Sequence, residues 1–326
     1  MVTSRDVAAA AGVSQATVSR VLAGGARVTD ATATRVRAAM SAVGYTPNLA
    51  ARTMKTGRSG TIGVVVADIT NPFYPEMLDA LGVALAAAGQ RMILWTESGP
   101  GESSAAEAIR GRLVDGVVFT TATRRSSTVR AALDRDLPVV LVNRGLPRVR
   151  CDQVTSDNVG GGAAVAEFLV AHGHRRIGLI TGPPHPSTAV DRERGFRRAL
   201  QAAGVGAPLV RAGDFSHATA WRAARELLTE AHPPTAIFGV NDLTAFGALD
   251  AARSLRRRVP TDVSIVGYDD VAMAAWESFD LTTVRQPTGE MAALAVDLLL
   301  GRIADPARSP VRRRFRTDLI VRGSTR

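Results

Sequence analysis

The spacing of hydrophobic residues changes near residue 60 of the chain, and the change predicts two kinds of structure. Before it, apolar residues recur every three to four positions in stretches 6–11, 15–22 and 30–43, which predicts helices. After it, short runs rich in Val and Ile alternate with longer helical stretches. The sequence therefore predicts a small all-α domain followed by a larger doubly wound α/β part.

The strands expected in the α/β part are short, apolar and often β-branched, as buried parallel strands are. They are expected at Ile62–Ala67, Met92–Trp95, Gly116–Phe119, Val139–Val142, Ile177–Thr181, Ala236–Val240 and Ser264–Tyr268. Helices are expected at 73–88, 159–171, 189–203, 216–230, 242–254 and 288–300. A body of about 265 residues exceeds one typical domain, so two lobes are expected.

The turn between the first two helices suits a DNA-binding module. Gly12 can take the positive φ that ends a helix, and Ser14 can cap the helix that follows. Two short helices joined in this way form a helix-turn-helix, whose second helix reads base edges in the major groove. An ordinary packed helical pair is the alternative. The residues of this segment expected to face DNA are Ser14, Gln15, Ala16, Thr17, Ser19 and Arg20.

The charge distribution favours the same interpretation. The chain has a formal net charge of +10, and residues 1–58 contain eight Lys and Arg against two Asp. Residues 302–326 have the same balance, so two basic ends flank a slightly acidic body. A basic N-terminal module indicates a polyanionic partner, with double-stranded DNA the first candidate. Solvated surface is the alternative explanation for the basic ends.

Several classes of protein are disfavoured by what the sequence lacks. Cys151 is the only cysteine, which excludes an internal disulfide and fits a reducing cytoplasm. No apolar run reaches the length of a membrane span, and the N-terminus does not resemble a secretory signal. Phosphate-binding, nucleophile-elbow and His-Glu-x-x-His motifs are absent, so no catalytic site, cofactor or metal is expected. A cytoplasmic location is expected.

Motifs in consistent order and spacing resemble the LacI/GalR family of bacterial transcription regulators. They are D-V-A-A-A-A-G-V-S-Q-A-T-V-S-R-V-L (6–22), V-T (28–29), G-Y-T-P-N (44–48), D-I-T-N-P-F-Y (68–74), D-N-V-G-G (157–161), N-D-L-T-A-F-G (241–247), V-S-I-V-G-Y-D-D (263–270) and L-T-T-V-R-Q-P (281–287). The resemblance covers nearly the whole chain and departs at 98–107 and 276–280. It implies a periplasmic-binding-protein-like core of two Rossmann-like lobes with a ligand in the cleft.

The same resemblance implies a hinge that becomes helical on DNA within a dimer. Met54 would wedge into the minor groove where the family usually has leucine. An ordinary flexible linker is the alternative. The expected domains are thus 1–47 for DNA binding, 48–60 for the hinge, and 61–326 for effector binding and dimerisation. The further residues expected to contact DNA are Arg27, Tyr45, Asn48, Ala51 and Met54.

Polar residues at the carboxyl ends of predicted strands indicate where the ligand binds, because ligands of open α/β sheets bind there. Asn143, Arg144, Asn241 and Asp269 occupy such positions, and Arg192 begins a predicted helix. By resemblance, Arg192, Asn241 and Asp269 match the main polar ligand contacts, and Asn143 matches another. Arg and Asp together can bind vicinal hydroxyls through charge-assisted hydrogen bonds. Simple turn residues are the alternative for Asn241 and Asp269.

Aromatic residues would complete the ligand site. Phe73, Phe215 and Trp276 can offer apolar faces to a sugar or base ring, and Gln286 follows the last predicted contact strand. Phe215 and Trp276 fit core positions equally well.

Together these features predict a ligand-responsive transcription regulator, a repressor in preference to an activator. It would bind a near-palindromic operator as a homodimer, with a small molecule, a sugar by preference, in the cleft. The alternatives are a purine- or nucleoside-responsive regulator, a secreted sugar-binding protein of a transport system, and an enzyme.

Overall fold

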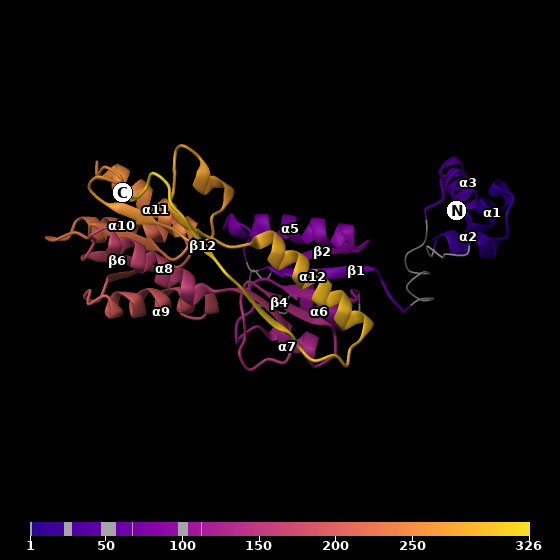
Figure 1. The fold of residues 1–326 in the computed structure, drawn as a ribbon. Helices are drawn as coiled ribbons and strands as arrows, with labels where there is room; N and C mark the ends of the chain where they lie inside the picture. Colours follow the sequence, from indigo (N-terminus) through magenta and orange to yellow (C-terminus); the bar gives the residue numbers. More distant parts are fainter. Residues whose placement is uncertain (1, 23–27, 47–56, 67, 97–103, 112) are drawn as a thin grey trace. The chain divides into compact units, whose positions relative to one another are not determined.

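The computed structural model describes residues 2–22, 28–46, 57–66, 68–96, 104–111 and 113–326 (Figure 1). The chain divides into two compact units, Met1–Ser59 and Gly60–Arg326.

The first unit contains the helix-turn-helix that the sequence predicts. Its helices are α1 (Ser4–Ala11), α2 (Gln15–Leu22) and α3 (Asp30–Ala42). Gly12 adopts a φ of 61°, and the Ser14 hydroxyl accepts a hydrogen bond from the Thr17 amide at 3.1 Å. Both local predictions for the turn are therefore confirmed.

A small apolar core holds these three helices together. Val7 of α1, Val18 of α2 and Val36 of α3 are fully buried against one another. One valine from each helix thus fixes the packing and leaves the opposite face of α2 to solvent.

The first lobe of the second unit is built on a six-stranded parallel sheet in the order β11-β5-β4-β3-β1-β2. Its strands are β1 (Thr61–Val66), β2 (Arg91–Thr96), β3 (Gly116–Phe119), β4 (Val139–Val142), β5 (Asp152–Ser156) and β11 (Arg312–Phe315). Its helices are α5 (Phe73–Ala87), α6 (Ser104–Arg110), α7 (Ser127–Leu133) and α12 (Thr288–Ala304). Val64 packs in the same core as α5 and α12, whereas Val65 packs with α6 and α7. Because neighbouring strand residues point to opposite faces, the two helix pairs cover opposite faces of the sheet.

The second lobe surrounds a four-stranded parallel sheet in the order β7-β6-β8-β9. Its strands are β6 (Ile177–Thr181), β7 (Leu209–Ala212), β8 (Ala236–Gly239) and β9 (Ser264–Val266). Helix α8 (Asn158–Ala171) packs on α9 (Ser187–Ala202), and α10 (His217–Leu228) packs on α11 (Asp242–Ser254). A short 3-10 helix (Ala272–Ala275) and the antiparallel pair β10 (Thr283–Arg285) and β12 (Asp318–Ile320) complete this lobe.

The chain passes between the lobes three times, after β5, β10 and β11. As a result, α12 and β11 come from the C-terminal part of the sequence but complete the first lobe, beside α5 and β5 (Figure 1). The Asp157 amide donates to the Phe315 carbonyl at 2.7 Å, which ties two of the crossing segments together.

The seven predicted strands and six predicted helices of the body all form, with ends shifted by a few residues. The sequence did not predict β5, β7, β10, β11 and β12 or helices α6 and α7, because they are short or carry many polar residues. The prediction that every expected strand is buried was wrong for β2. Most of its side chains are exposed because it is the edge strand of its sheet.

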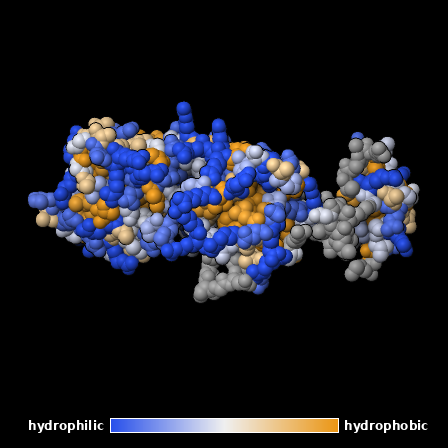
Figure 2. All heavy atoms as spheres, turned by 90° about the horizontal axis from the view of Figure 1, so that it is seen from below, coloured by the Kyte–Doolittle hydropathy of each residue, from blue (hydrophilic) through white to orange (hydrophobic). Residues whose placement is uncertain are grey.

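Apolar residues reach the surface of the body as separate areas among hydrophilic ones (Figure 2). None of the helices in the described ranges is long and apolar enough to cross a membrane.

Candidate functional site

The exposed face of α2 presents the residues predicted to read DNA. Gln15, Ala16 and Arg20 are exposed, as is Ser14 in the turn, whereas Thr17 and Ser19 are half-buried. The Gln15 amide donates to the Ser4 hydroxyl at 2.9 Å, so α1 holds that side chain in place. In contrast, the described part of the chain supplies no hydrogen bond or ion pair to the Arg20 guanidinium. Arg20 is therefore free to contact a base edge.

The other predicted DNA contacts divide into two groups. Tyr45 is half-buried and packs on the core of the first unit, so its ring also has a structural role. Arg27, Asn48, Ala51 and Met54 lie outside the described residues, and their DNA contacts stay predictions.

A buried ion pair forms the centre of the predicted effector site. Arg192 of α9 and Asp269, in the loop after β9, lie 2.9 Å apart with side chains only 3% and 4% exposed. The Arg192 Nε donates to Asn158 Oδ1 at 2.8 Å, and a second guanidinium nitrogen donates to the Val240 carbonyl at 2.8 Å. The Tyr268 ring packs against the guanidinium, 3.7 Å from its central carbon. Arg192 is thus oriented by four groups from three segments of the second lobe.

Gln286 joins this network at a crossing between the lobes. Its amide donates to Asp269 Oδ1 at 2.7 Å, and its carbonyl accepts a hydrogen bond from the Ser156 hydroxyl. Burial raises the pKa of Asp269, while the adjacent positive charge of Arg192 lowers it. The structure therefore brings Arg192, Asp269 and Gln286 together, three of the residues predicted for the ligand.

The first lobe contributes a second polar group. Arg144, after β4, donates to the Tyr74 hydroxyl at 2.8 Å and to the Thr121 carbonyl at 3.1 Å. Its neighbour Asn143 adopts a positive φ of 71°. Asn143 Oδ1 and Arg144 Nε are buried without a hydrogen-bond partner among the described residues. Phe73 is also buried here and meets Tyr74 edge-on.

The polar groups of the two lobes face one another. Burial raises the pKa of Tyr74, and the charges of Arg144, Asp269 and Arg192 also act on it. Hydrogen bonds between described residues also join the lobes directly. The Ala272 amide donates to Glu76 Oε1 at 2.7 Å, and the Gly145 amide donates to the Ser187 hydroxyl at 3.1 Å.

Asn241 and Asp242 directly follow Val240, whose carbonyl accepts a hydrogen bond from Arg192, and lie at the N-terminus of α11. The Asn241 Oδ1 caps α11 by accepting from the Thr244 amide at 3.0 Å, which gives this residue a turn role at the site. Asp242 is buried and accepts from the Val271 amide at 2.9 Å. Burial and, to a smaller extent, the negative charge of Asp269 together raise the pKa of Asp242 to about 8. Asp242 therefore positions the loop that carries Asp269.

The remaining two predicted aromatic residues lie in different surroundings. Phe215 is half-buried with a φ of 54°, and its ring packs so closely on Gly182 that a Cβ there would lie 2.5 Å away. The Trp276 side chain is 54% exposed and stacks on Phe279 with ring centroids 6.5 Å apart. Within the described residues, no hydrogen bond or ring contact links Trp276 to the Arg192 network.

Sequence reasoning did not single out four residues that complete the cluster. Ser156 is the last residue of β5, whose polar sequence D-Q-V-T-S gave no strand signal, and Asn158 is the first residue of α8. Tyr268 directly precedes Asp269, and Tyr74 directly follows Phe73. Both tyrosines also lie within motifs that carry the family resemblance, at 68–74 and 263–270, and this was a signal for them.

Comparison with known families and proteins agrees with this architecture. Residues 3–48 match the family of bacterial regulatory proteins called lacI, and residues 166–325 match a periplasmic binding protein-like domain. The HTH-type transcriptional regulator CelR of Thermobifida fusca is 38% identical over 98% of this chain and 96% of its own. The ribose operon repressor of Escherichia coli K12 is 32% identical over 99% of this chain and 100% of its own.

Solved structures give the same result. A complex of the regulator CelR with cellobiose has a TM-score of 0.77 and 36% identity, covering 99% of this chain and 100% of its own. The lac repressor dimer bound to operator and an anti-inducer has a TM-score of 0.85 and 27% identity, covering 99% of each chain. The chain belongs to the lacI family of bacterial regulatory proteins and is a ligand-responsive, DNA-binding transcription regulator.

Proposed function

We propose that the effector of this regulator is a small neutral sugar held by the buried cluster. The observation that carries this proposal is the ion pair of Arg192 and Asp269, nearly fully buried and extended by Gln286. Each sugar hydroxyl both donates and accepts a hydrogen bond, so a guanidinium donor beside a carboxylate acceptor suits neighbouring hydroxyls.

Unsatisfied atoms in the first lobe support the same ligand. Asn143 Oδ1 is a buried acceptor and Arg144 Nε a buried donor, and neither has a partner among the described residues. Buried polar atoms of this kind are normally hydrogen-bonded, and a hydroxylated ligand can supply both partners. The cellobiose complex of CelR and the ribose operon repressor are relatives whose names also point to sugars.

We further propose that two copies repress transcription from a near-palindromic operator. Each copy would place one α2 in a half-site, so the symmetry of the dimer would be mirrored in the DNA. The likeness to the lac repressor dimer bound to operator supports this arrangement. Sugar binding would change the arrangement of the two lobes and hence the affinity for DNA, with a coupling of about 1–3 kcal/mol.

An exposed apolar face on the first lobe suits the contact between two copies. Met92 and Leu94, on the α5 side of the edge strand β2, are 38% and 41% exposed, and Val83 of α5 is 66% exposed. An apolar edge strand with free backbone groups favours pairing with another chain. We propose that this face is buried in the homodimer.

One experiment tests the DNA and effector proposals together. The purified protein is used to select fragments of genomic DNA, with and without a panel of neutral monosaccharides, disaccharides and purine bases. We expect enrichment of one near-palindrome and its release by a sugar. The same sugar is expected to raise the melting temperature of the protein, because it binds the folded state only.

The outcomes separate the parts of the proposal. Enrichment of a single half-site without dyad symmetry would contradict the dimer. Release by a purine base, and not by a sugar, would replace the effector class while leaving the DNA proposal intact. Failure to enrich any sequence at low salt, even with cell extract as a source of corepressor, would contradict operator binding.

A further inference from the structure

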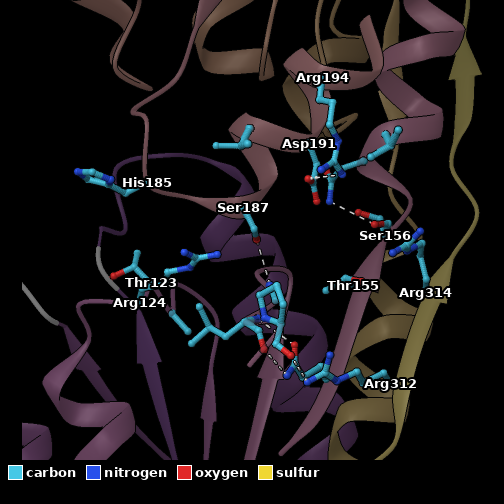
Figure 3. A pocket seen from close by; sticks show the side chains of 18 of the residues that line it. Thr123, Arg124, Thr155, Ser156, His185, Ser187, Asp191, Arg194, Arg312 and Arg314 are labelled. Atoms are coloured by element: carbon cyan, nitrogen blue, oxygen red, sulfur yellow. Dashed lines mark hydrogen bonds and ion pairs between the residues drawn. The ribbon is translucent and has the colours of Figure 1, made fainter. Parts of the chain in front are cut away.

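A hollow lies between the two lobes, next to the buried cluster. Its volume is about 910 Å³, which is within the range of small-molecule sites. Segments that follow β3 and β4 line it from the first lobe, and the starts of α8 and α9 line it from the second (Figure 3). Ser156 and Asn158 lie on its wall, whereas none of the nine residues predicted to bind the effector lines it within the described chain. The residues that line the hollow therefore differ from those proposed to bind the sugar.

The lining of this hollow is strongly basic. Two aspartates oppose its arginines. Arg194 pairs with Asp191 at 2.8 Å, and Arg314 lies 4.0 Å from Asp157. The lining arginines are Arg124, Arg125, Arg194, Arg312, Arg313 and Arg314. Arg313 lies beside Phe315 on the other face of β11, so three guanidinium charges, those of Arg124, Arg125 and Arg312, remain at the hollow without a carboxylate.

Arg124 and Arg125 are the clearest surplus charges. They are consecutive, exposed and located in the turn that follows β3. The described residues offer neither guanidinium a hydrogen bond or an ion pair. Arg312, on the opposite wall, donates to the Pro147 and Val149 carbonyls at 2.7 and 3.0 Å, so its positive charge is held in place but not neutralised.

The start of α9 adds to the positive potential. This helix of 16 residues begins at Ser187 on the wall of the hollow, and Pro186 at its N-cap provides no side-chain acceptor for the first amides. Such helix starts attract anions through free amides and the helix dipole. The helix start and the arginines therefore favour the same kind of ligand.

We propose that this hollow binds a small phosphorylated metabolite with at least two negative charges, as a second effector. Guanidinium groups bind phosphate through paired hydrogen bonds, and the available volume accommodates a phosphorylated sugar rather than a bare ion. Both lobes supply the walls, so the anion favours one arrangement of the lobes. By reciprocity, the bound anion changes the affinity for the sugar by the same factor by which the bound sugar changes the affinity for the anion.

The test is titration calorimetry on the full chain at low ionic strength. The ligands are a hexose 6-phosphate, the same hexose without phosphate, and inorganic pyrophosphate. The variant R124Q/R125Q removes two charges from the hollow, and the matched control R256Q/R257Q removes two exposed charges from outside it. We expect the hollow variant to bind the hexose phosphate about tenfold more weakly or worse, while the control binds it normally.

Each alternative outcome is informative. Equal weakening in both variants would reduce the effect to general electrostatics and overturn the proposal. Unchanged binding of the hexose phosphate by R124Q/R125Q would also overturn the proposal, because the anion would then bind elsewhere, for example on the basic N-terminal unit. Tight binding of pyrophosphate without the hexose phosphate would also overturn the sugar-phosphate assignment. An unchanged melting temperature of R124Q/R125Q shows that the variant is folded, so weaker binding of the hexose phosphate then reports on the hollow.

Discussion

Arg20 on α2 and Arg192 on α9 use the same guanidinium group in opposite settings. Arg20 is exposed and unpaired within the described chain, whereas Arg192 is buried against a carboxylate, an amide, a carbonyl and an aromatic ring. The first can bind DNA without disturbing the fold. The second is part of the fold, so any ligand that contacts it also acts on the segments that hold it.

This difference explains how one chain can combine sequence reading with ligand response. A recognition surface works best when its side chains are not committed to the interior. A sensing site works best when ligand binding competes with, or adds to, contacts between the lobes. The hydrogen bonds that the Ala272 amide donates to Glu76 and the Gly145 amide donates to Ser187 are such contacts between the lobes.

The largest expected effect comes from breaking the buried pair. Asp269→Asn keeps the shape of the side chain and suits the φ of 123° at this position, but it leaves Arg192 charged and unpaired. We expect the free energy of unfolding to fall by about 3–5 kcal/mol and effector binding to be lost, while operator binding without effector remains. Denaturant unfolding and operator titrations measure these quantities.

The matched control for that variant is Asp262→Asn, which breaks the exposed pair of Asp262 and Arg258. Exposed pairs contribute about 0–1 kcal/mol, so this change is expected to leave stability and effector response nearly unaltered. An Asp269→Asn protein with a normal effector response would remove Asp269 from the site.

The next effect concerns the pH dependence of stability. Burial raises the pKa of Asp242 in the folded state from 3.8 to about 8, so the folded chain holds a proton that the unfolded chain loses. This group therefore lowers stability as the pH rises from about 4 to 8. Asp242→Asn should flatten that decline in unfolding experiments across this range.

The first unit provides the opposite sign for comparison. Hydrogen bonds from the Thr3 backbone and side chain lower the pKa of the exposed Asp6, so its contribution to stability is present above pH 4 and lost in acid.

The Asp242 prediction has a clear contradicting outcome. If the stability of the Asp242→Asn protein changed with pH between 4 and 8 as steeply as that of the parent, Asp242 would not titrate in the folded body as described.

The smallest expected effect is on operator choice. Arg20→Ala is expected to leave the melting temperature unchanged, because the side chain is exposed. It should relax base preference at one operator position by about 1–3 kcal/mol. The control Arg37→Ala removes an exposed charge from α3 and should weaken all DNA sequences alike. Identical sequence preferences of the Arg20→Ala and parent proteins in a binding-site selection would contradict the assignment.

The sequence predicted the local features of both regions well. Gly12 and Ser14 form the predicted turn because the left-handed φ and the capping bond depend on residues close together in the chain. The long amphipathic helices and apolar strands of the body were found for the same reason. Strand β5 was missed, because its buried polar residues are matched by partners far away, such as Arg302 for Asp152 at 3.0 Å.

Sequence alone therefore determined the module that reads DNA, the α/β class of the body and which side chains follow strand ends. Tertiary structure alone decided which of those side chains meet. Arg192 and Asp269 meet because the second lobe places α9 beside the loop after β9, and a crossing between the lobes adds Gln286, whereas Trp276 remains at the surface. Capping and periodicity act over a few residues, but a buried charge is stabilised only by the groups that the whole fold brings around it.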